Sequence, residues 1–332
     1  LTSFETMEDE QWLHIHGLSR GHPLVLELIN RGASAGAFHE TLENYVTVEI
    51  FSKLSAEQKR VLSALSIFRE PVHLEALAQQ KLNTDELDSL VESGLARQAD
   101  AETYDVHDLI REFLLRSLST ALREEFHAKC VEWYQKQTSS HDMLIELVYH
   151  SIKSSQFEDA SALVVKEGRQ LISQGYMELL GLIEQIETKD LEADVVIRMA
   201  QLQGDILALL GRLEEAEEVL NNTLELAKKN SDELVQAEIL SSLADVSRKQ
   251  GNSELSLSRH KSALKHYISL GHARWAARTY NNIGYLLRRK NERNKALEAY
   301  GEVEAILEGS TDDDLIYSQI TLARSLIELG EV

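Results

Sequence analysis

Few side chains in this 332-residue sequence combine the types and the spacing that catalysis or metal binding requires. The run Gly32-Ala33-Ser34-Ala35-Gly36 matches the Gly-x-Ser-x-Gly pattern of hydrolase nucleophiles. That pattern needs a strand before it, and here an amphipathic helix precedes it, so we interpret the run as a helix cap and turn. His14 and His16 are two residues apart and diverge on a helix. Cys130 is the single cysteine, which excludes a disulfide framework and a cysteine-based zinc site. We expect no catalytic residue and no metal site.

A phosphate-binding loop is also missing from the sequence. No Gly-x-x-x-x-Gly-Lys-Ser/Thr segment occurs, and no expected strand ends in consecutive acidic residues that could hold Mg²⁺. The chain by itself is therefore expected neither to hydrolyse ATP nor to hold it tightly.

The charge balance argues against a nucleic-acid partner. The 34 basic and 55 acidic residues give a net charge of −21, so the chain as a whole would repel phosphates. The helix expected over Asn83–Ser93 carries Asp85, Glu86, Asp88 and Glu92 and no basic residue, whereas a helix that reads DNA needs donors facing phosphates and bases. The sequence shows no signal peptide and no run of about 18 apolar residues. These features predict a cytoplasmic protein without a membrane span.

Three different segments precede the C-terminal part of the chain. Residues 1–50 predict a helical subdomain of three short helices. Residues 51–118 predict three helices, a β-hairpin and a further helix, which together are typical of a winged helix. Residues 119–190 predict a helical connector with degenerate repeats.

The C-terminal segment, 191–332, contains an internal repeat with a period of about 40 residues. A small residue recurs in each unit, and a turn residue follows seven positions later. The small residues are Gly204, Ala244, Gly284 and Ala323, and the turn residues are Gly211, Gly251, Asn291 and Gly330. Each unit is expected to be a helix–turn–helix that cannot bury its apolar face alone, so that neighbouring units stack into a solenoid. The fold class expected for the whole chain is all-α with one small β-hairpin.

The first helices of these repeats are expected to line a concave groove that binds a partner. The positions expected to face it are Arg198, Gln201, Asp205 and Ala208, then Glu238, Ser241, Asp245 and Arg248, then Arg278, Asn281, Tyr285 and Arg288. The third set is basic and aromatic in an acidic protein, so an acidic peptide or an anionic ligand could bind there. A solvated charged face is the alternative interpretation.

The repeat spacing resembles that of tetratricopeptide repeats, although its period is longer than is usual for that family. Residues 167–220 are also similar to the sensor arm of the bacterial maltose-regulon activator family. The similarity lies in Glu167-Gly168, Leu171-Ile172, Leu179-Leu180 and the run from Gly211 to Glu217.

Two motifs in the N-terminal half resemble those of STAND ATPases, the signal-transduction ATPases with numerous domains. Gly21-His22-Pro23-Leu24 is similar to the Gly-x-Pro motif of that family, whose proline contacts the adenine. Val106-His107-Asp108-Leu109 is similar to its Met-His-Asp motif, whose histidine meets the β-phosphate of bound ADP. The resemblance covers essentially the whole chain and implies nucleotide-sensing roles for four residues: Gly21, Pro23, His107 and Asp108.

The STAND resemblance implies the regulatory and sensor part of a nucleotide-dependent switch. ADP or ATP with Mg²⁺ would then bind only together with a nucleotide-binding domain, which we expect before Leu1. The repeats would bind a protein or a small-molecule inducer, and the activated full-length protein could self-associate. Two alternatives stay open: a repeat scaffold without a nucleotide role, and a winged-helix transcription regulator.

Overall fold

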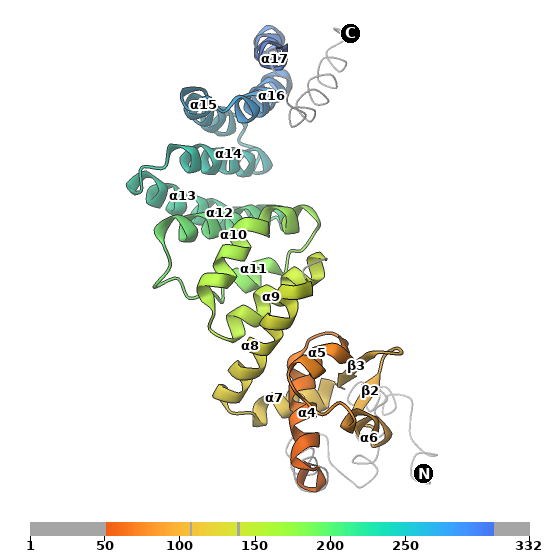
Figure 1. Cartoon of the computed structure of the whole chain (residues 1–332). Helices are drawn as coiled ribbons and strands as arrows, with labels where there is room; N and C mark the ends of the chain where they lie inside the picture. Colours follow the sequence, from red (N-terminus) through yellow and green to blue (C-terminus); the bar gives the residue numbers. More distant parts are fainter. Residues whose placement is uncertain (1–50, 107, 138–139, 309–332) are drawn as a thin grey trace, which may run out of the picture. The chain divides into compact units, whose positions relative to one another are not determined.

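A computed structural model describes residues 51–106, 108–137 and 140–308. These residues are mainly helical with one small three-stranded sheet, which confirms the expected fold class (Figure 1). The chain divides into two compact units, Leu1–Gln156 and Phe157–Val332, and the division falls inside the segment expected to be a connector. The motif residues Gly21, Pro23 and His107 lie outside the described residues.

The described part of the first unit contains short helices and strands followed by two longer helices. Its elements are η2 (Phe51–Lys53), α4 (Ala56–Ile67), β1 (Val72–His73), α5 (Leu74–Gln79), α6 (Glu86–Glu92), β2 (Ala96–Gln98), β3 (Thr103–Val106), α7 (Asp108–Ser117), α8 (Thr120–Gln137) and α9 (His141–Lys153).

Helix α4 begins at a capping box, which the Ser-x-x-Gln spacing of Ser55 and Gln58 predicts. The backbone N–H of Gln58 donates to Oγ of Ser55 at 3.0 Å, and the backbone N–H of Ser55 donates to Oε1 of Gln58 at the same distance. Apolar residues of this helix, Val61, Leu62 and Leu65 among them, are buried. Local sequence signals and core packing therefore agree for this helix.

The sheet contains one strand more than the expected hairpin. Strand β3 is central, and it pairs antiparallel with β2 on one side and with β1 on the other. Pro71 is typical of a helix start and predicts a helix over Val72–Gln79, but Val72 and His73 pair with Tyr104 and Thr103 instead. Helix α5 therefore starts two residues later, at Leu74, where the side chain of His73 caps it by accepting from the backbone N–H of Glu75.

A buried polar cluster lies where α9 packs against α8 and the end of α4. Arg69 donates from Nε to Oε1 of Glu146 at 3.0 Å, so the half-buried guanidinium neutralises a nearly buried carboxylate. Nδ1 of His127 lies 2.8 Å from Nδ1 of His150, so one of these nitrogens donates to the other. Burial lowers the pKa of His127 to about 4 and that of His150 well below its usual range, so both rings are neutral near pH 7.

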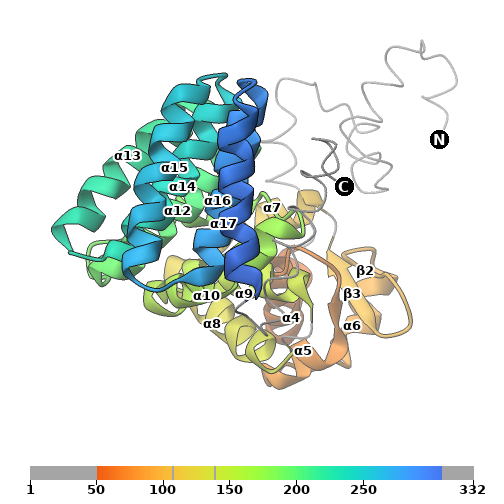
Figure 2. The same ribbon diagram turned by 90° about the horizontal axis from the view of Figure 1, so that it is seen from above.

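The second unit consists of stacked helices, with α12 to α17 side by side in both views (Figures 1 and 2). It opens with α10 (Phe157–Ser173) and the short α11 (Leu179–Ile183). Three helical hairpins follow at a constant spacing: α12 (Ala193–Leu209) with α13 (Leu213–Lys229), α14 (Glu233–Lys249) with α15 (Ser253–Ser269), and α16 (Ala273–Arg289) with α17 (Arg293–Glu308).

The turns inside the hairpins use the residues that the repeat analysis identifies. Gly211, Gly251 and Asn291 have φ values of +79°, +84° and +61°. Glycine and asparagine tolerate this left-handed conformation better than other residues, so each first helix can end sharply at these positions.

The small residues of the repeat allow the two helices of a hairpin to approach closely. A Cβ placed on Gly204 would lie 2.6 Å from Cγ of Leu220 on α13. A Cβ on Gly284 would overlap the ring of Tyr300 on α17, which is fully buried. The small residue therefore recurs with the repeat period because a larger side chain would not fit where the two helices of a hairpin cross.

Candidate binding groove in the repeats

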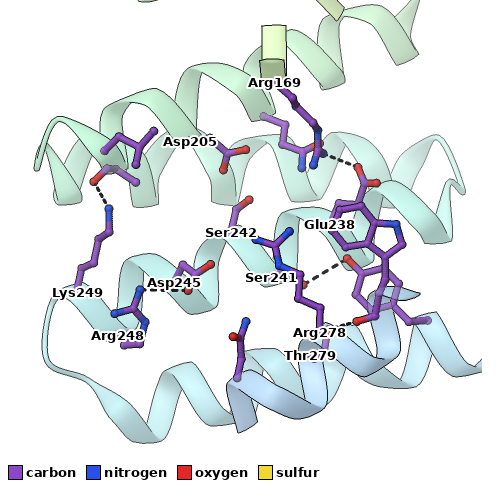
Figure 3. A pocket seen from close by; sticks show the side chains of 16 residues that line it. Arg169, Asp205, Glu238, Ser241, Ser242, Asp245, Arg248, Lys249, Arg278 and Thr279 are labelled. Atoms are coloured by element: carbon purple, nitrogen blue, oxygen red, sulfur yellow. Dashed lines mark hydrogen bonds and ion pairs between the residues drawn. The ribbon is translucent and has the colours of Figure 1, made fainter. Parts of the chain in front are cut away.

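The first helices of the repeats, together with α10, line a groove with a volume of about 320 Å³ (Figure 3). Successive hairpins start at a constant spacing, so equivalent positions on α12, α14 and α16 face the same side of the stack. The groove is lined by Arg169, Gln201, Asp205, Ala208, Leu209, Glu238, Ser241, Ser242, Asp245, Arg248, Lys249, Tyr267, Trp275, Arg278, Thr279 and Asn282.

Many of the groove residues expected from the sequence lie together in it. Those that line it are Gln201, Asp205, Ala208, Glu238, Ser241, Asp245, Arg248 and Arg278. Arg198 is placed beside the lining residue Glu238, with Nη1 3.9 Å from Oε2.

The third repeat departs from this expectation. Asn281 is only 3% exposed, because it lies one turn after Ala277 and one turn before Gly284 on the buried face of α16. Tyr285 and Arg288 do not line the groove, and the Arg288 guanidinium lies 5.6 Å from the centre of the Tyr285 ring instead. Asp108, for which the STAND resemblance implies a nucleotide-sensing role, is the first residue of α7, in the other unit.

Sequence reasoning missed the contribution of α10 and of the first turn of α16. Arg169 comes from α10, which lies before the first hairpin and does not follow the repeat period. Trp275 precedes the positions counted in the third repeat. A Cβ on Gly168 would lie 2.8 Å from Cδ1 of Leu202, so α10 packs closely on α12, but this glycine stands outside the repeat period and gives no signal of it in the sequence.

An ion-pair group closes one end of the groove. Nη2 of Arg169 donates to Oε2 of Glu238 at 2.9 Å, and Arg198 approaches the same oxygen. The Glu238 side chain is 10% exposed, whereas that of Arg169 is 50% exposed. A single carboxylate on α14 thus links α10 and α12 to the neighbouring repeat.

An aromatic pair lies at the same end of the groove. The ring of Trp275 stacks on that of Tyr267 with centroids 6.0 Å apart, and the Tyr267 hydroxyl lies 3.3 Å from Oγ of Ser241. Burial raises the pKa of Tyr267 to about 12, so the hydroxyl keeps its proton. The guanidinium groups of Arg169 and Arg278 lie 5.9 and 5.5 Å from the Trp275 ring centre. This distance allows cation–π attraction.

The middle of the groove contains a carboxyl group that is easier to protonate than usual. Burial raises the pKa of Asp205, and the nearby carboxylates of Asp245 and Glu238 raise it further, whereas a hydrogen bond with Ser242 and the charge of Arg169 oppose the shift. Asp205 and Ser242 therefore place an acceptor and a hydroxyl where a ligand could donate to them (Figure 3).

The other end of the groove is basic and apolar. Nζ of Lys249 donates to the backbone carbonyl oxygen of Ala208 at 2.6 Å, near the C-terminus of α12. Nη2 of Arg248 lies 3.4 Å from Oδ1 of Asp245. Leu209 is 56% exposed beside them. This surface can bind both apolar and charged groups.

The described helices provide neither a metal cluster nor a membrane-spanning segment. In residues 51–308 outside the gaps, no group of three or more His, Cys, Asp or Glu side chains could hold a metal ion. None of the helices described in that range is long and apolar enough to cross a membrane.

Comparison with known proteins identifies the repeats. Residues 196–267 and 235–309 match the tetratricopeptide repeat family, so the three hairpins of the second unit are repeats of this type. Tetratricopeptide repeats support a role in protein interaction or sensing. No curated protein matches the chain by sequence.

Several solved structures are similar to the chain. A STAND protein with a tetratricopeptide repeat sensor from Pyrococcus horikoshii matches 98% of this chain and 55% of its own length, with 23% identity and a TM-score of 0.43. The chain therefore spans about half the length of that protein. BtubC from P. vanneervenii matches 64% of this chain and 85% of its own length, with 18% identity and a TM-score of 0.41. The apo form of RapI matches 96% of this chain and 86% of its own length, with 13% identity and a TM-score of 0.42.

Proposed function

We propose that the chain is the regulatory and sensor part of a STAND-type nucleotide-dependent switch, in which the repeat groove binds a protein segment or another inducer. The observation that carries the sensor role is the groove itself, which is lined with charged, aromatic and hydroxyl side chains. Binding there would favour one arrangement of the switch over another and so shift its population.

The size and the lining of the groove suit a short segment of a larger partner. A volume of about 320 Å³ lies at the lower end of the range for ligand sites. The backbone of an extended peptide offers both donors and acceptors, which the carboxylates, hydroxyls and guanidinium groups of the lining can satisfy. A peptide that crosses α12, α14 and α16 would connect repeats that otherwise contact only their neighbours.

The first unit would carry the nucleotide-sensing role in this proposal. Its helices and its three-stranded sheet suit a winged helix that places the Val-His-Asp motif between β3 and α7. Polar contacts hold the end of β3, just before His107, in place. Asp105 pairs with both Arg97 and Arg111, and Nη2 of Arg111 also donates to the carbonyl oxygen of Val106 at 3.3 Å. ADP or ATP with Mg²⁺ would be held mainly by a phosphate-loop domain, which these 332 residues do not supply.

A structural role for the winged helix is favoured over DNA binding. Helix α6, which would be its recognition helix, carries the exposed acidic residues Asp88 and Glu92. These side chains would repel the DNA backbone.

Selection of short random peptides on the immobilised chain tests the sensor role of the groove. An enriched peptide is synthesised with a fluorescent label, and its affinity is measured by anisotropy. Ser242→Phe, which fills the middle of the groove, is expected to weaken binding roughly tenfold or more. Ser258→Phe, at an exposed position on α15, is the matched control and is expected to bind like the wild type. The proposal fails if no peptide is enriched, or if Ser242→Phe binds as tightly as the control.

A further inference from the structure

One position of the repeat carries a charge in each of three successive hairpins. Arg198, Glu238 and Arg278 recur with the repeat period and occupy equivalent places on α12, α14 and α16. The charges alternate in sign along the stack. Two arginines that precede Glu238 in the chain neutralise its carboxylate. Oε2 of Glu238 accepts from Nη2 of Arg169 at 2.9 Å and lies 3.9 Å from Nη1 of Arg198.

Arg278 is the cation at the other end of this series. Its side chain is exposed and lines the groove. Within the described part of the chain no carboxylate pairs with it, and its guanidinium lies 5.5 Å from the centre of the Trp275 ring. Holding a guanidinium against an indole limits its rotation and leaves its N–H groups directed to an incoming acceptor.

The surroundings of Trp275 carry an excess of positive charge. Arg169 and Arg278 lie 5.9 and 5.5 Å from its ring centre. Arg169 shares Glu238 with Arg198, which leaves more guanidinium groups than carboxylates at this end of the groove. This local excess contrasts with the net charge of −21 for the chain.

We propose that the Trp275 end of the groove recognises an Asp or Glu side chain in an extended segment of a partner protein. The carboxylate would pair with Arg278 as Glu238 pairs with Arg169, and it would continue the alternation of charge along the stack. An apolar side chain next to it would contact the half-buried indole of Trp275. This inference rests on the proposed peptide-binding function of the groove and specifies its partner.

A segment with one acidic residue fits the groove better than a polyanion. Two carboxylates, those of Asp205 and Asp245, line the groove beyond the Trp275 end. They would repel a polyphosphate or a run of acidic residues. They would accept hydrogen bonds from peptide N–H groups.

The test uses random peptides selected in parallel on the wild type, on Arg278→Glu and on Lys261→Glu. The last variant makes the same change of charge at an exposed position on α15 outside the groove. We expect the wild type and Lys261→Glu to enrich peptides with Asp or Glu beside an apolar residue, and Arg278→Glu to lose this enrichment. One enriched peptide is then compared with its Asp→Asn or Glu→Gln form. We expect the amide form to bind the wild type about tenfold more weakly and to bind Arg278→Glu no more weakly than the acid form.

The outcomes separate this inference from the proposed function. If peptides are enriched and Ser242→Phe blocks them, but they lack acidic residues or ignore Arg278→Glu, the groove binds peptides and the acidic specificity is wrong. If no peptide is enriched on any variant, both proposals are wrong. Circular dichroism and a thermal melt of each variant establish that it is folded before its binding is compared.

Discussion

Arg169 and Glu238 form an ion pair with a distance of 2.9 Å between Nη2 and Oε2, although the whole of α12 and α13 separates them in the chain. Arg198 of α12 approaches the same oxygen. One carboxylate therefore ties α10 to the first two repeats, and α10 becomes a wall of the groove. This link is why the lining extends beyond the regular repeats.

Glu238→Gln is expected to lower the free energy of unfolding of the second unit by about 1 kcal/mol, because two guanidinium groups lose their shared carboxylate while the amide keeps part of the hydrogen bonding. Urea unfolding followed by circular dichroism measures the change. Glu225→Gln is the control, since Glu225 pairs with Lys228 where both side chains are more than half exposed. That variant is expected to unfold like the wild type, because water screens an exposed pair. Equal losses in the two variants would show that the Glu238 pair is an ordinary surface pair.

Two helical glycines are expected to respond to alanine in opposite directions. A Cβ on Gly284 would overlap the buried ring of Tyr300, so Gly284→Ala is expected to destabilise the fold by about 1–3 kcal/mol. Nothing lies within 4 Å of a Cβ on Gly301, so Gly301→Ala is expected to stabilise α17 by about 0.5–1 kcal/mol. Trp275 fluorescence during urea unfolding reports both changes when Trp12 and Trp133 are replaced by phenylalanine. A neutral Gly284→Ala would mean that the tyrosine can move aside at little cost.

The sequence predicts the repeat architecture well because packing imposes it at fixed intervals. Gly204 and Gly284 recur where two helices must touch, and Gly211 and Gly251 recur where the backbone must adopt positive φ. These requirements are local to one hairpin, so their spacing alone reveals them.

The groove is less predictable because it depends on which helix faces meet across repeats. Counting along each first helix places Asp205, Asp245 and Arg278 in the groove but also selects Asn281, which is buried. The contribution of Arg169 depends on the placement of α10, which follows no repeat spacing. Tertiary contacts of this kind leave no periodic trace in the sequence.

His107→Ala is expected to weaken ADP retention in the natural protein that carries this chain, if the motif acts as the STAND resemblance implies. Removal of a phosphate contact would favour nucleotide exchange and the active arrangement without inducer. The measurement is the amount of ADP released when the purified protein is denatured, together with activity in the absence of inducer. Arg116→Ala, at an exposed position on the next helix, is the control. Unchanged ADP content in His107→Ala would refute the sensing role of the motif.

His260 is expected to make the stability of the second unit depend on pH. It is 1% exposed, and among the described residues neither ring nitrogen has a hydrogen-bond partner. Burial lowers its pKa from 6.5 to about 4, with Arg248 and Arg278 adding to the shift and Asp245 opposing it. The unfolded chain therefore binds a proton at a pH where the folded chain does not. The contribution of this pKa shift to the free energy of unfolding is fully present above pH 6.5. It is lost as the pH falls toward 4, by at most about 3 kcal/mol.

His260→Leu tests this dependence, because leucine has a similar size and no polar atom to bury. We expect it to raise the free energy of unfolding by about 1 kcal/mol at pH 7.5, and by more at pH 5.5, since the unfavourable burial of the ring nitrogens and the proton linkage are both removed. His272→Leu, at the half-buried N-cap position of α16, controls for loss of an imidazole as such. The neutral pair of His127 and His150 also titrates in acid, but its contribution cancels when each variant is compared with the wild type at the same pH. If stability falls with pH as steeply in His260→Leu as in the wild type, another group is responsible for the acid sensitivity.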